Sequence, residues 1–106
     1  MRQFATGATR DTNEGKVDFL RFIGWAAMQR FGRYMHKHRR QADGQLRDAD
    51  NWKKGIPIES YVESWVRHTV DAGTAHERQD YDALDELACA VLFNVQGYLQ
   101  ERSKGQ

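Results

Sequence analysis

Apolar residues recur at helical spacing over most of this chain, and this periodicity constrains its fold more than any other feature. The spacing predicts helices over about 17–39, 58–72 and 81–102, with Gly73 ending the second. The third is expected to pack through a stripe of leucine and valine between Leu84 and Leu99. The sequence shows no strand pattern with hairpin punctuation and no internal repeat. We therefore expect an all-α fold, a small bundle of three main helices with a long packed loop.

Two segments lie outside these helices. Residues 1–16 are polar, contain Gly7 and Gly15, and are expected to form an extended arm. Residues 41–57 contain two glycines and the only proline, which is typical of an irregular connection. Connections longer than about 12–15 residues are usually functional or disordered, and Trp52 and Ile56 indicate that this one packs against the helices.

The length of the chain fits a single domain over residues 1–106. A lone Cys89 excludes an internal disulfide and a cysteine-based zinc site. The first residues lack the apolar stretch of a signal peptide, and no window approaches the ~20 apolar residues that span a bilayer. We therefore expect a cytoplasmic protein with no membrane partner.

The first predicted helix is unusually apolar. Besides its core positions it carries Phe19, Phe22, Trp25 and Met28 on other faces. This is more apolar surface than a small monomer covers. We therefore expect a homo-oligomer in which a second chain packs against this helix.

The net charge of +1 conceals two blocks of opposite sign. Residues 30–47 carry six cations and one anion, whereas residues 59–86 carry eight anions and two cations. The blocks could pair within the fold, or they could serve a phosphate and a metal ion respectively. An extended double-stranded nucleic acid is not expected as a partner, because the acidic block opposes it and no helix-turn-helix signal is present.

Carboxylates cluster at helical spacing on the second and third predicted helices. Glu59 and Glu63 share one face at i, i+4, and Asp82, Asp85 and Glu86 share another. Converging from facing helices, such groups could hold Mg²⁺, which prefers oxygen ligands. The alternative is that they face solvent and simply favour the helix dipole near the helix starts.

Cations and aromatic residues outside the acidic block are candidates for binding phosphate and base. The basic residues between 33 and 40 offset the dipole at the end of the first predicted helix, and their number also suits phosphate binding. His68 is expected either to contact phosphate or to be a buried structural histidine. Trp52, between polar loop residues, is the candidate for stacking on a base.

Several motifs resemble those of one protein family. They are TGATRDTNEGK, RFGRYM, DNWKKGIP with SYVESWVRH, and DELACAVLFN, in this order along nearly the whole chain. They are similar to the phage-type dATP/dGTP diphosphohydrolase N-terminal family, which is related to the MazG-like all-α nucleotide pyrophosphohydrolases. The resemblance implies a helical, Mg²⁺-dependent oligomer that cleaves a deoxynucleoside triphosphate into monophosphate and pyrophosphate.

The resemblance also implies roles for individual residues. Those expected to bind substrate come from the arm, the loop and the second helix, and they are Arg10, Lys16, Asn51, Trp52, Lys54, Arg67 and His68. The metal motif departs from the family pattern, because Cys89 stands where a metal-binding aspartate is expected. A thiol is a soft ligand that Mg²⁺ does not favour, and Asp82 or Asp85 would have to substitute.

Two functions are therefore predicted. In the first, a pyrophosphohydrolase, Mg²⁺ is held by four carboxylates, of which Glu63 and Glu86 are also the catalytic residues: Glu59, Glu63, Asp85 and Glu86. In the second, a phage protein has kept the nucleotide pocket without catalysis and sequesters a nucleotide signal of host defence. A third interpretation is an oligomeric helical module whose charge blocks pair between subunits.

Overall fold

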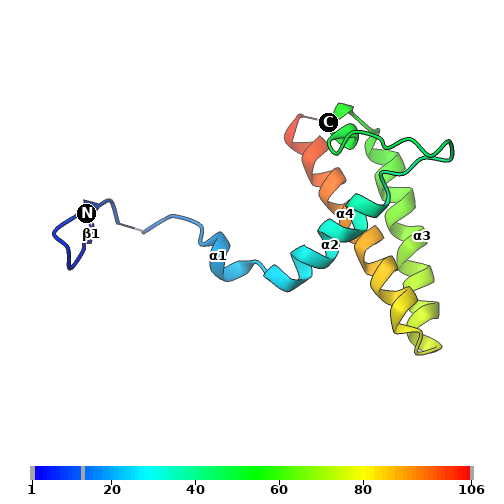
Figure 1. Ribbon diagram of the computed structural model, residues 1–106, viewed down its shortest axis with the longest axis horizontal. Coiled ribbons are helices and arrows are strands. Elements are labelled where there is room, and N and C mark those ends of the chain that lie inside the picture. The colour runs from blue at the N-terminus through cyan, green and yellow to red at the C-terminus, as the bar shows by residue number, and fades with distance from the viewer. Residues whose placement is uncertain (1, 13, 106) are drawn as a thin grey trace.

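The computed structural model describes residues 2–12 and 14–105 and is mostly helical (Figure 1). Its elements are β1 (Arg2–Gln3), β2 (Thr9–Arg10), α1 (Phe19–Phe22), α2 (Trp25–Lys37), the single 3-10 turn η1 (Asn51–Lys54), α3 (Ile58–Glu77) and α4 (Tyr81–Ser103). The predicted all-α class is confirmed. Within the described residues, none of the helices has the length and apolar character that a bilayer crossing requires.

α3 and α4 form an antiparallel helical hairpin that contains the core (Figure 1). Tyr61 of α3 is only 1% exposed, and its ring lies on the backbone of α4 at Gly97. Cys89 and Ala90 are also buried on α4, where small side chains leave room for close packing of the neighbouring helices. The contact face of α4 therefore differs from the predicted leucine and valine stripe. It includes Cys89 and Ala90, whereas Leu99 of the stripe is 59% exposed.

α3 continues past the predicted stop at Gly73 and ends only at Glu77. Apart from the neighbouring backbone of its own helix, nothing lies within 4 Å of a Cβ built at Gly73. The helix continues through this position without a break. The real stop is Gln79, whose φ of 57° is left-handed. The amide of Asp80 donates to Ala75 O at 2.9 Å, a Schellman closure. The prediction was wrong because glycine tolerates a helix interior when tertiary packing supports the helix.

The predicted first helix is broken in two. α1 ends at Phe22, Ile23 is extended with φ −93° and ψ 133°, and Gly24 is the N-cap of α2. The Trp25 indole Nε1 donates to Leu20 O at 3.3 Å across the break. α2 then packs across α4, and Phe31 of α2 is buried. The continuous helix over 17–39 was wrong because Gly24 has a low helix propensity and residues 24–27 are exposed, so little packing compensates for it.

The predicted extended arm contains a small antiparallel hairpin, in which Arg2 pairs with Arg10 and Gln3 with Thr9. The absence of strands that we inferred from the sequence is therefore corrected for this segment. Four residues are too few for a period-two pattern to be visible. The arm projects away from the helices (Figure 1).

Candidate functional site

An ionic cluster around Glu86 fixes the end of α2 to α4. Arg30 Nη2 lies 2.8 Å from Glu86 Oε1, and Lys37 Nζ lies 2.8 Å from Glu86 Oε2. His38 Nε2 is 3.8 Å from the same Oε2. The hydrogen bonds from Lys37 and Arg30 lower the pKa of Glu86 to about 2. Both carboxylate oxygens of Glu86 are thus engaged by cations of α2.

Cys89 lies one turn further along α4, beneath this cluster. It is 6% exposed, and the Arg30 guanidinium donates to its Sγ from Nη1 at 3.7 Å. Burial raises the pKa of the Cys89 thiol, which keeps it protonated at neutral pH. The thiol therefore packs in the helix interface and is unsuited to act as a nucleophile.

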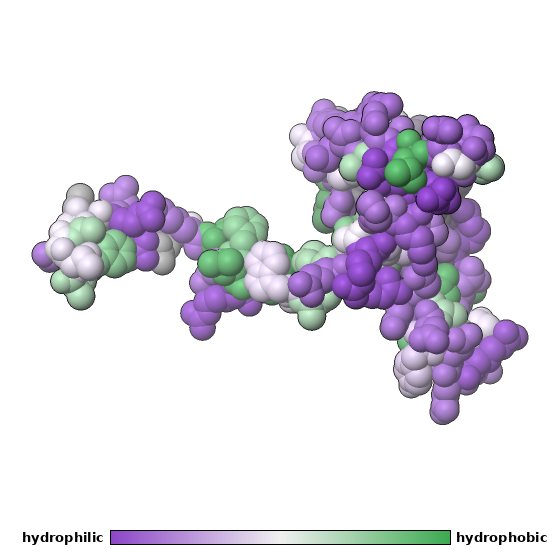
Figure 2. Space-filling model, in the orientation of Figure 1, coloured by the Kyte–Doolittle hydropathy of each residue, from purple (hydrophilic) through white to green (hydrophobic). Residues whose placement is uncertain are grey.

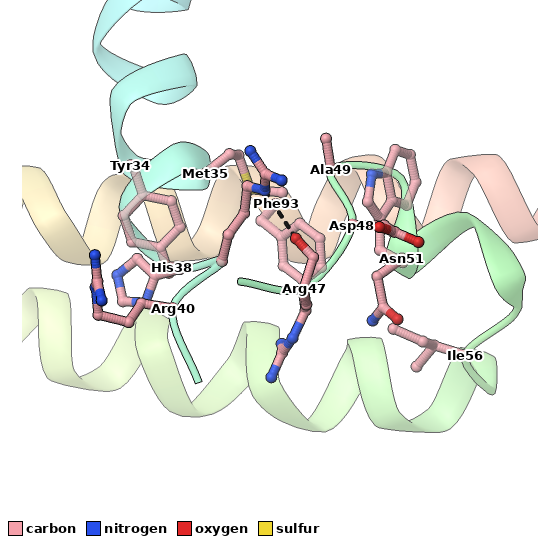
Figure 3. Close-up of a pocket in the computed structure, with 12 residues that line it drawn as sticks. Tyr34, Met35, His38, Arg40, Arg47, Asp48, Ala49, Asn51, Ile56 and Phe93 are labelled. Atoms are coloured by element: carbon pink, nitrogen blue, oxygen red, sulfur yellow. Dashed lines mark hydrogen bonds between the residues drawn. The ribbon is translucent and has the colours of Figure 1, made fainter. Parts of the chain in front are cut away.

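A pocket of about 430 Å³ opens beside the cluster, between the end of α2, the loop that follows it and α4 (Figure 3). Trp52 of η1 meets Phe93 of α4 edge to face, with ring centroids 6.2 Å apart. The rings of Tyr34 and His38 lie 4.3 Å apart at the other end of the pocket. This volume lies in the range typical of small-molecule sites.

The loop 39–47 folds back on itself to form one wall of this pocket. The Asp43 carboxylate accepts a hydrogen bond from the Gln45 amide at 2.9 Å, and Gly44 takes the left-handed φ of 83° that the turn requires. The amide of Arg47 then donates to Arg39 O at 2.7 Å. This closure brings Arg47, at the end of the loop, next to Arg39 and Arg40 at its start.

Three arginines line the pocket: Arg39, Arg40 and Arg47. None of them forms an ion pair with any residue in the described part of the chain. Arg39 Nε donates to Arg47 O at 2.8 Å, which supports the loop. Asp48 is the one carboxylate in the lining, and Figure 3 shows it at the end away from Arg40 and His38. The pocket thus has a cationic end and an excess of positive charge, which favours anions.

The structure divides the substrate residues predicted for the arm and loop among three places. Asn51 and Trp52 line the pocket. Lys54 lies in an adjoining hollow that shares Asn51 with it. Arg10 and Lys16 line a separate hollow of about 530 Å³ on the N-terminal arm, remote from the helical hairpin (Figure 1).

The two substrate residues predicted on α3 also lie outside the pocket. Arg67 is exposed and donates from Nη2 to Ser64 Oγ at 3.0 Å. His68 is half-buried, and its Nδ1 has no hydrogen-bond partner within the described residues. A single chain therefore brings only Asn51 and Trp52 of the predicted substrate set into this pocket.

The predicted metal ligands do not converge within one chain. Among residues 2–12 and 14–105, no three His, Cys, Asp or Glu side chains lie together as a metal site would require. Tyr61 of α3 faces Gly97 of α4, and the two helices are antiparallel, so Glu63 lies opposite about residue 95 of α4. That position is roughly 13 Å along the helix axis from Glu86. Glu59 is one turn further away still, Asp85 is exposed, and Glu86 is held by cations.

The pocket also contains residues that were left out of the predicted set. His38, Arg39 and Arg40 belong to the basic run that was expected to suit phosphate, and Arg47 was counted only as a member of the basic block 30–47, whereas Phe93 was not predicted for the site. Membership of the basic block was the signal that the sequence carried for Arg47. Phe93 gave no signal beyond an ordinary core residue.

Comparisons of the chain with protein-family models, with curated proteins and with solved structures find no match. The family resemblance of the motifs therefore stays a prediction, and the function is argued from the site alone.

Proposed function

We propose that this protein binds a nucleotide in the pocket between α2, the loop 39–56 and α4. The observation that carries the proposal is the pairing of unneutralised arginines with an aromatic wall in one cavity. Arg40 and Arg47 would bind phosphate oxygens, because guanidinium groups donate strong charge-assisted hydrogen bonds to phosphate. Trp52 would contact the base, since stacking on an aromatic ring is worth about 1–3 kcal/mol per base.

The same geometry favours binding over turnover. Phosphoryl chemistry in the family that the motifs resemble needs Mg²⁺ held by several carboxylates, and the described residues of one chain do not group them. Glu86 is already neutralised by Arg30 and Lys37. The cations of the pocket can neutralise phosphate charge without a metal. Hydrolysis of dATP or dGTP stays a prediction from the resemblance.

Titration calorimetry with dATP, dGTP and ATP in the presence of EDTA tests the proposal. We expect binding without a metal, weakened about tenfold or more by Arg47→Gln, because a hydrogen bond to a charged group contributes about 1.5–3 kcal/mol. Arg33→Gln is the matched control, since Arg33 is an exposed arginine on α2 in a different hollow. Equal weakening by both variants, or no binding by the wild-type chain, would refute the proposed site.

A second variant separates the two halves of the pocket. Trp52→Leu should weaken nucleotide binding but leave the affinity for inorganic triphosphate unchanged, because only the base contacts the indole. Loss of both affinities would contradict the assigned role of Trp52. Pyrophosphate released from dATP or dGTP only when Mg²⁺ is added would overturn the conclusion that binding proceeds without turnover.

A further inference from the structure

An exposed apolar segment joins the arm to α2. Between residues 17 and 25 five large apolar side chains are 54% to 77% exposed: Val17, Phe19, Leu20, Phe22 and Trp25. Figure 2 shows this hydrophobic stretch between the arm, whose surface is mixed, and the hydrophilic end of α2. Aromatic residues bury about 150–250 Å² each, so this patch reaches the upper limit that monomers usually expose.

The whole chain has more surface than a folded monomer of its mass. Its accessible surface is 8431 Å², whereas a compact monomer of 12.3 kDa exposes about 6,100 Å². Its radius of gyration is 18.7 Å, against about 13 Å for a compact chain of this length. The surplus of about 2,300 Å² per chain is larger than the ~800 Å² that each partner buries in a standard protein interface.

A second apolar strip lies on the outer face of α3. Val62, Val66 and Val70 are spaced four residues apart, and Val66 and Val70 are 57% and 65% exposed. They line a shallow groove of about 600 Å³ together with charged residues at the same spacing: Glu63, Arg67 and Asp71. Within the described residues, none of these three charges is in an ion pair.

The charges of the exposed segment complement those of the groove. Along the groove they alternate as negative, positive, negative, with a rise of about 6 Å per four helical residues. The exposed segment carries Lys16, Asp18 and Arg21, which alternate as positive, negative, positive. At most about 6.6 Å separates Lys16 from Asp18 along the chain, and about 4.5 Å separates Asp18 from Arg21, so both spacings lie within about 1.5 Å of those in the groove. Each set of three charges is symmetric about its central residue. Asp18 therefore faces Arg67 whether the segment runs parallel or antiparallel to α3.

We propose that residues 16–25 of one copy dock in the Val62–Val66–Val70 groove of a second copy of this chain. The occupant is a second copy because only Ile23 and Gly24 separate α1 from α2, and α2 holds α1 away from the α3 of its own chain (Figure 1). When each copy docks its segment in the groove of the other, both apolar strips are buried in both copies and the dimer is symmetric. The inference needs no bound ligand and is independent of the proposed pocket.

Disulfide trapping between two differently tagged chains tests this docking. One chain carries Leu20→Cys and the other Val66→Cys. The native Cys89 is buried and present in both chains, so any cross-linking through it defines the background. We expect an oxidised heterodimer that joins the two tags. Tyr81→Cys replaces Val66→Cys in the matched control, because Tyr81 is equally exposed but lies outside the groove. That pair should give only background cross-linking.

The solution mass from light scattering provides a second readout that does not depend on trapping. The wild-type chain should be a dimer, and Leu20→Asp and Val66→Asp should each shift it toward the monomer. Tyr81→Asp should leave the mass unchanged. A monomeric wild type, a dimer that does not trap Leu20→Cys with Val66→Cys, or binding of the segment to neutral lipid vesicles instead of a second chain would each overturn the proposal.

Discussion

The ring of Tyr61 on α3 packs directly on Gly97 of α4, and replacing this glycine with alanine tests how the hairpin is packed. A Cβ atom at this position would overlap Cε1 and Cζ of Tyr61 and lie 2.8 Å from Cδ1. The ring cannot move outward, because Tyr61 is 1% exposed and is flanked by Phe93 at a centroid distance of 5.9 Å. The two helices must therefore separate or the ring must leave its position.

The expected loss follows from two opposing effects. Overpacking a buried site costs about 1–3 kcal/mol, and a clash with a ring that cannot retreat belongs at the upper end. Alanine in place of a helical glycine recovers about 1 kcal/mol of helix propensity. We expect Gly97→Ala to lower the free energy of unfolding by about 2 kcal/mol. Gly73→Ala is the matched control, since nothing lies within 4 Å of its Cβ position, and it should raise stability by about 1 kcal/mol.

Urea unfolding followed by far-ultraviolet circular dichroism measures both variants, at one protein concentration so that association affects them equally. The two should differ by about 3 kcal/mol. In a Tyr61→Leu background the penalty of Gly97→Ala should largely disappear, because the ring that clashes is gone. If Gly97→Ala is as stable as Gly73→Ala, the close contact between Tyr61 and α4 is not present and the reasoning fails.

Three other measurements test individual contacts of the helical body. The pKa of Glu86 is lowered to about 2 in the folded chain, so its ion pairs stabilise the fold above the unfolded pKa of about 4.3 and are lost as the pH falls toward 2. The difference in melting temperature between wild type and Glu86→Gln should accordingly shrink between pH 5 and pH 2, and a constant difference would contradict the pairing with Arg30 and Lys37. The Cys89 thiol should react with a thiol reagent only as the chain unfolds in urea, and rapid labelling of the native protein would show that it is not packed. Asp80→Ala should lower stability by about 1 kcal/mol in the same urea assay, because the Asp80 carboxylate accepts the amide of Ala83 at 3.1 Å, whereas an unchanged midpoint would mean that this cap is dispensable.

Where a local signal controls an element, the sequence predicts it well. The third predicted helix, 81–102, matches α4 within one residue at its end, because the Asp80 cap and the apolar periodicity act over neighbouring residues. The helix boundaries at glycines were predicted least accurately. Gly73 does not end α3, whereas Gly24 does interrupt the first predicted helix, and the two differ in whether neighbouring helices support the segment.

The candidate site was predicted in part. Trp52 and Asn51 were selected from a polar loop with an unexpected aromatic residue, and both line the pocket. Arg47 and Phe93 could not be selected, because the loop closure and the position of α2 across α4 bring them together from distant parts of the chain. The carboxylates failed to converge because residue spacing reports which groups share a face of one helix, not the register of that helix against the next.

Periodicity, charge blocks and an over-apolar first helix were determined by the sequence alone, since each is a property of residues close together in the chain. They define an all-α protein with a basic end to α2 and an apolar segment before it. Only the tertiary structure decided that Glu86 pairs with Arg30 and Lys37, and that three loop arginines line a pocket without carboxylate partners in the described chain. The physical reason is that helix register and loop closure are set by packing at single points, such as Tyr61 on Gly97, which no local pattern encodes.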